Sequence, residues 1–72
     1  METRAHYWNG RWGRLGRRDI YLRVDADRWY VEDRSGGADG DSSWYELDTE
    51  DAAVDRVRAQ MSAGDGWRRL GG

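Results

Sequence analysis

The sequence predicts an α+β domain: a small antiparallel β-meander of three to five strands with one C-terminal α-helix packed on one face. Two patterns predict this fold. Apolar and polar residues alternate through the middle of the chain between clusters of Gly, Asp and Ser, and a capped segment with helical spacing follows them. A chain of 72 residues buries about 60% of its surface on folding, so we expect residues 1–72 to form a single domain.

Residues 1–18 are predicted to form a basic arm or hairpin rich in Gly, Arg and Trp. The pair Asn9-Gly10 separates the aromatic residues Tyr7 and Trp8 from Trp12, and Asn-Gly favours the type I′ turn of a tight hairpin. Three Gly-Arg triplets follow one another through residues 9–17. An extended chain with three residues per turn would display their Arg side chains on one side.

Residues 19–47 are predicted to form antiparallel strands. One strand covers residues 20–24, and after a turn at 25–27 a second covers 29–34, with Trp29 and Val31 on one face. A Gly/Asp/Ser loop at 35–42 leads to a strand at 43–47. The last strand leaves two interpretations open, because either Tyr45 and Leu47 or Trp44 can face the core.

Residues 49–63 are predicted to form the helix, with Asp48 or Thr49 as its N-cap and Gly64 as a left-handed residue at its end. Its apolar stripe consists of Ala53, Val54, Val57 and Met61. In the tail, residues 64–72, Trp67 and Leu70 are expected to fold back on the core. Leu, Ile and Val are few, so we expect the five Trp and four Tyr to build a largely aromatic core.

The composition argues against catalysis and against metal or cofactor binding, so we expect no enzyme activity, no cofactor and no metal. The chain has no Cys, no Lys and the single imidazole of His6, for which we expect no special role. Asp39, Asp41, Ser43 and Glu50 have the spacing of some EF-hand ligands, but Trp44 stands where that loop needs Gly. Nothing in the pattern around Glu32, Asp33 or Glu46 indicates a buried carboxylate.

Net charge changes sign along the chain. Residues 1–24 carry six Arg against two acidic residues, residues 25–55 two Arg against eleven, and residues 56–72 four Arg against one.

The chain also lacks any long apolar run. We therefore expect neither a signal peptide nor a membrane span, and we expect a cytoplasmic location. Exclusive use of Arg as the basic residue is typical of GC-rich coding, which favours a bacterial source.

The outward face of the predicted sheet favours a non-catalytic interaction or regulatory module. Trp, Tyr and Arg dominate binding hot spots, and a free strand edge also allows a homodimer. The partner is then a protein, docked on that face or edge. A structural interpretation stays open, in which Glu32 or Glu46 pairs with the Arg residues in a cross-strand ladder. The predicted interaction face consists of Tyr21, Arg23, Tyr30, Arg34 and Trp44.

The alternative function is nucleic-acid binding through the N-terminal segment. Guanidinium groups pair with phosphates, and Trp side chains offer stacking surfaces for bases. The competing interpretation pairs these Arg side chains with the acidic middle of the chain. The residues in question are Trp8, Arg11, Trp12, Arg14, Arg17 and Arg18.

Two short stretches resemble known nucleic-acid-associated families. Residues 12–16, Trp-Gly-Arg-Leu-Gly, resemble the signature of the WGR domain, a module known from poly(ADP-ribose) polymerases. That family places strands ahead of the motif, whereas eleven residues precede Trp12 here, so we transfer neither function nor sites from it. Three strands followed by residues 48–53 are similar to the strand-to-helix joint of ethylene-response-type DNA-binding domains and integrase arm-binding domains.

Overall fold

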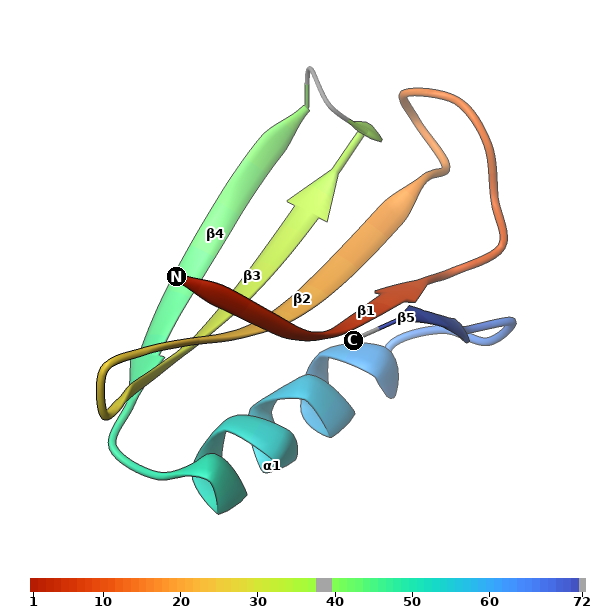
Figure 1. Ribbon diagram of the computed structural model, residues 1–72. Helices are drawn as coiled ribbons and strands as arrows, with labels where there is room; N and C mark the ends of the chain where they lie inside the picture. The colour runs from red at the N-terminus through yellow and green to blue at the C-terminus, as the bar shows by residue number, and fades with distance from the viewer. Residues whose placement is uncertain (38–39, 72) are drawn as a thin grey trace.

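The computed structural model describes residues 1–37 and 40–71. The elements are β1 (Glu2–Trp8), β2 (Arg18–Asp25), β3 (Arg28–Ser35), β4 (Asp41–Leu47), α1 (Glu50–Met61) and β5 (Arg68–Gly71). The strands form one antiparallel sheet in the order β4-β3-β2-β1-β5 (Figure 1). The predicted α+β meander with a C-terminal helix is therefore confirmed, with five strands.

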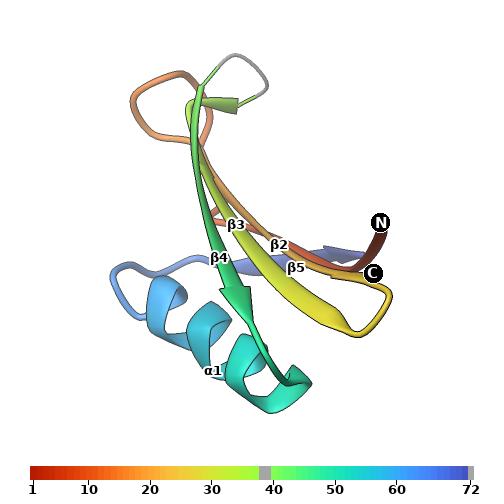
Figure 2. The same ribbon diagram turned by 90° about the vertical axis from the view of Figure 1, so that its left-hand side faces the viewer.

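The helix links the two edges of the sheet. The chain leaves β4 at one edge, crosses one face as α1, and returns at the other edge as β5 beside β1. Figure 2 shows α1 on one side of the curved, twisted sheet. The opposite side has no helix over it, and we refer to it as the open face.

The core lies between the sheet and α1. It consists of Ala5, Ile20, Leu22, Val31, Ala53 and Val57. The expectation of a largely aromatic core is wrong, because Tyr7, Trp29, Tyr45 and Trp67 are only partly buried and pack around these small aliphatic residues. Ile20, Leu22 and Val31 of the sheet, with Ala53 and Val57 of α1, fill the space between the two layers instead.

Alternation along β4 settles which residues of that strand face the core. Tyr45 and Leu47 pack against the core, whereas Trp44 is half exposed on the open face. In the tail, Trp67 packs on the core as expected. Leu70 does not, because it lies in the short edge strand β5 and remains exposed.

The helix begins as predicted and ends earlier than predicted. The Thr49 hydroxyl accepts a hydrogen bond from the Ala52 N–H at 3.2 Å, so Thr49 rather than Asp48 is the N-cap. The last helical residue is Met61, two residues before the predicted end. Gly64 does not take the left-handed conformation, which occurs instead at Gly66 with φ of +77°.

The predicted tight hairpin at Asn9-Gly10 does not form, and residues 1–18 are not an arm outside the sheet. β1 is a strand of the sheet between β2 and β5, and residues 9–17 form the connection to β2, which we call the basic loop. Asn9 has negative φ, and its N–H donates to the carbonyl of Arg18 at 3.1 Å. Asn9 thus extends the β1–β2 pairing instead of turning the chain.

In the described part of the chain, no helix combines the length and the apolar character needed to cross a membrane.

Candidate functional site

All five residues of the predicted interaction face lie on the open face. Leu22, Val31 and Tyr45 point to the core, and successive side chains of a strand point to opposite sides. The register places Tyr21 opposite Glu32, and Glu32 opposite Trp44. The open-face residues considered below are His6, Asp19, Tyr21, Arg23, Tyr30, Glu32, Arg34 and Trp44.

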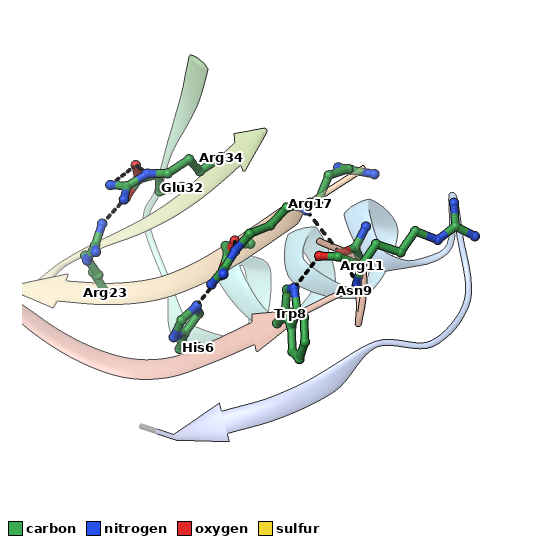
Figure 3. Close-up of polar contacts among 10 residues, drawn as sticks. His6, Trp8, Asn9, Arg11, Arg17, Arg23, Glu32 and Arg34 are labelled. Atoms are coloured by element: carbon green, nitrogen blue, oxygen red, sulfur yellow. Dashed lines mark hydrogen bonds and ion pairs between the residues drawn. The ribbon is translucent and has the colours of Figure 1, made fainter. Parts of the chain in front are cut away.

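Glu32 is a buried carboxylate at the centre of the open face. It is 1% exposed. One carboxylate oxygen accepts from Nη1 of Arg23, and the other accepts from Nε and Nη2 of Arg34 at 3.1 and 2.8 Å and from the Ser42 hydroxyl at 2.7 Å (Figure 3). These contacts join β2, β3 and β4, and they hold two guanidinium groups in fixed positions.

Asp19 is a second buried carboxylate on the same face. It is also 1% exposed. Arg17 donates to its two oxygens from Nε at 2.8 Å and from Nη2 at 3.2 Å, and Nε2 of His6 lies 2.7 Å from Oδ2 (Figure 3). The basic loop is thereby tied to β1 and β2 at the point where it enters the sheet.

Both carboxylates are ionised in the folded protein. Burial by itself raises the pKa of Asp19, but the hydrogen bonds and charges of Arg17 and His6 outweigh it and lower the pKa below its ordinary value. For Glu32, burial is likewise outweighed by hydrogen bonds from Ser42, Arg23 and Arg34, and its pKa is also lowered. In return, the bond to Glu32 raises the pKa of Arg34.

Aromatic rings and guanidinium groups form a continuous layer over the two carboxylates. The Tyr21 ring stacks on His6 with centroids 4.2 Å apart, and the Arg23 guanidinium lies 4.3 Å from the same ring. Arg34 lies 5.3 Å from the Tyr21 ring, and Arg23 lies 5.3 Å from the Trp44 ring. These distances are those of cation–π contacts, so the layer spans the sheet from β1 to β4.

The structure confirms the cross-strand ladder and corrects two expectations about single residues. Glu32 is the residue that pairs with Arg23 and Arg34, whereas Glu46 pairs with Arg28 at 3.2 Å. Glu32 is buried although no pattern indicated it, and His6 is not without a role. The alternation of residues 19, 21 and 23 along the strand could have predicted that Asp19 lies on the same face as Tyr21 and Arg23.

The six residues of the predicted nucleic-acid segment do not share one side. Residues 13–17 form a turn, closed by a hydrogen bond from the Arg17 N–H to the Gly13 carbonyl at 2.9 Å, so the expected extended array of Arg side chains is wrong. Arg17 reaches Asp19 on the open face, whereas Arg18 reaches Asp33 on the helix side at 2.6 Å.

The remaining residues of that segment gather on the basic loop. Arg11 extends toward the chain between α1 and β5, where it lies 3.6 Å from Asp65 (Figure 3). Arg14 has no ion pair among residues 1–37 and 40–71. The Trp8 indole donates to the Arg11 carbonyl at 2.9 Å and packs edge-on against Trp12, which is 75% exposed.

Asn9 organises the basic loop from within. Its side-chain amide donates to the Gly16 carbonyl at 2.8 Å and accepts from the N–H groups of Arg11 and Arg18 at 3.2 and 3.1 Å. One buried side chain therefore closes both ends of the loop.

Among the described residues, no cluster of three or more His, Asp or Glu side chains is arranged to hold a metal ion. Asp39, the first position of the EF-hand spacing, lies outside the described residues.

Comparisons with known proteins find no matching protein-family model, no similar curated protein and no similar solved structure.

Proposed function

We propose that this chain is a non-catalytic binding module that docks a protein partner through the open face of its sheet. The observation that carries the proposal is the pair of buried carboxylates, Asp19 and Glu32, on the side of the sheet that α1 does not cover. Their ion pairs fix Arg17, Arg23 and Arg34. A surface that is ordered before binding loses less side-chain entropy when a partner docks.

The chemistry of the open face indicates what the partner must offer. Trp44 is 50% exposed beside Arg23. The contacts to Glu32 and Thr3 leave one NH₂ group of the Arg23 guanidinium and one of the Arg34 guanidinium without a protein acceptor among the described residues. A suitable partner places an apolar side chain on Trp44 and carbonyl or carboxylate oxygens at the two guanidinium groups.

Selection from a random-peptide display library tests this function. We expect the selected peptides to shift the amide resonances of Tyr21, Arg23 and Arg34. We expect Trp44→Ala to weaken peptide binding by at least about tenfold, because a buried aromatic anchor contributes about 2 kcal/mol or more. Trp12→Ala is the matched control, because it removes an exposed Trp from the basic loop. Peptides whose binding survives Trp44→Ala, or whose shifts avoid the open face, would contradict the proposal.

The alternative, nucleic-acid binding, is favoured by a different observation. The exposed Trp12 ring lies on the same loop as Arg11 and Arg14, which are the two Arg residues of this segment least engaged by carboxylates. An exposed aromatic ring beside weakly paired Arg side chains is suited to binding single-stranded nucleic acid. This function requires binding that weakens steeply as salt increases.

A further inference from the structure

A pocket on the helix side of the sheet lies apart from the open face. The basic loop, the end of β3 and the turn between α1 and β5 enclose a cavity of about 290 Å³. That volume is at the lower end of the range for small-molecule sites. We call it the loop pocket, and its polar and aromatic lining residues are Asn9, Arg11, Arg14, Arg17, Arg18, Ser35, Asp65 and Trp67.

Cations predominate in the loop pocket. Arg18 is balanced by Asp33 at 2.6 Å, and Arg11 lies 3.6 Å from the exposed Asp65. Arg14 lines the pocket without an ion pair among the described residues. An anion that enters the pocket therefore meets at least one guanidinium whose charge no described carboxylate offsets.

A buried donor lacks an acceptor at the same place. Trp67 lines the pocket, and its indole Nε1 is buried with no hydrogen-bond partner in the described part of the chain. Buried polar groups are hydrogen-bonded in the great majority of proteins. The Arg18 guanidinium lies over the face of the Trp67 ring, 5.5 Å from its centroid.

The C-terminal end of α1 repels an anion in the pocket less than a helix end with unpaired carbonyl groups would. The carbonyls of Arg58 and Met61 accept hydrogen bonds from the N–H groups of Ser62 and Gly64, and the Ala59 carbonyl accepts from the Ser62 hydroxyl at 2.7 Å. Because these carbonyls are already engaged, much of the partial negative charge of the helix end is satisfied within the turn.

We propose that the loop pocket binds a small phosphate ester. A phosphate group has several acceptor oxygens, so it can accept from Arg14 and from a second donor such as the Trp67 N–H at the same time. The apolar surfaces of Leu15, Ala63 and Trp67 then line the space for the rest of the molecule. Arg17 lines the loop pocket as well as pairing with Asp19, but Arg23, Arg34 and Trp44 of the open face do not line it. The proposal therefore does not depend on a protein partner docking at Trp44.

An NMR titration of the full chain tests the proposal, with the indole N–H resonances as the readout and Trp67→Phe to assign Trp67. The probes are inorganic phosphate, adenosine monophosphate, adenosine and a single-stranded oligonucleotide. We expect phosphate and the monophosphate to shift the Trp67 indole resonance saturably, and adenosine to leave it unchanged. Loss of a charge-assisted contact in Arg14→Gln weakens binding of the monophosphate by about tenfold.

Two further variants separate a specific site from general attraction to positive charge. Arg4→Gln removes the same charge from the far end of β1, where Arg4 forms an exposed pair with Glu2, and it should leave binding unchanged. Gly64→Ala adds a Cβ about 3.8 Å from the Trp67 Nε1, and it should weaken binding without any change of charge.

Three results would overturn the proposal. The first is a Trp67 resonance that does not respond saturably to phosphate or to the monophosphate. The second is an equal loss of binding in Arg4→Gln and Arg14→Gln. The third is a response to the oligonucleotide alone, with shifts at Trp12 and Arg11 but none at Trp67, which would assign the basic loop to nucleic acid instead.

Discussion

Glu32 and Asp19 are carboxylates that the fold buries on the side of the sheet left open by α1. Glu32 has two guanidinium partners, and Asp19 has the Arg17 guanidinium and the His6 ring. An ionised carboxylate removed from water is stable only when it is paired and hydrogen-bonded. The partners stay partly exposed, so the surface that solvent meets consists of guanidinium groups and aromatic rings. The two buried carboxylates, Asp19 and Glu32, thus determine which groups the open face presents to solvent.

Replacing Glu32 by Gln is expected to destabilise the protein by about 1–3 kcal/mol, because the charge that compensates Arg23 and Arg34 is lost and a buried polar group is left poorly paired. Urea unfolding followed by circular dichroism measures this change. Glu46→Gln is the matched control on the same face. Glu46 is exposed, and among residues 1–37 and 40–71 its ion pair is with the exposed Arg28, so a change below about 0.5 kcal/mol is expected there. Equal effects of the two substitutions would refute the role assigned to Glu32.

The Asn9 side chain holds the basic loop in place. Nine residues separate β1 from β2. The Asn9 side chain makes three hydrogen bonds in that connection, and the two to Gly16 and Arg18 cross its base. The loop shapes one wall of the loop pocket, so its order and the pocket depend on the same contacts.

Asn9→Ala removes all three of these hydrogen bonds and leaves the N–H of Arg18 and the carbonyl of Gly16 without their side-chain partner. We expect a loss of about 1–3 kcal/mol, together with faster amide hydrogen exchange in residues 11–17. Thr49→Ala is the comparison, since it removes the N-cap of α1 at a similar expected loss of about 1 kcal/mol. If exchange in the basic loop were to rise equally in both variants, Asn9 would have no specific effect on the loop.

Charge is distributed unevenly over the whole molecule. The basic loop lies at one end of the sheet, and the β2–β3 turn with Asp25 and Asp27 lies at the other end, on the side where α1 begins with Glu50 and Asp51 (Figure 1). The molecule therefore presents a basic end and an acidic end although its formal net charge is −2. Such a layout affects association and its dependence on salt rather than the fold.

Stability of the whole molecule should fall at acid pH because of Asp19 and Glu32. Their pKa values are lower in the folded state than in the unfolded chain, so as pH falls the unfolded chain binds protons first. The stabilisation is complete above about pH 5 and is lost as pH drops through roughly 4 and below. Unfolding free energies measured from pH 7 to pH 3 should show this decline, and the double variant Asp19→Asn/Glu32→Gln should show a shallower one. An unchanged slope in that variant would assign the acid sensitivity to other groups.

Local patterns in the sequence determined the order and type of most elements. Alternation at Ile20, Leu22 and Val24 predicts β2, and the apolar stripe with its N-cap predicts α1, because both signals depend on neighbours a few residues apart. The same alternation puts Tyr21, Arg23, Tyr30, Arg34 and Trp44 on one face once the strands pair. Their common location was therefore predictable, whereas their partners were not.

The tertiary structure alone decided the features that depend on residues distant in the chain. Asn9-Gly10 has a strong local preference for a tight turn, but pairing of β1 with both β2 and β5 extends the strand to Trp8 and carries the connection to residue 17. Glu32 becomes buried because Arg23 and Ser42 arrive from the neighbouring strands β2 and β4 and join Arg34 of its own strand. The loop pocket closes only where the basic loop meets the turn after α1. A contact between residues tens of positions apart leaves no periodic trace in either segment, so only the folded arrangement reveals it.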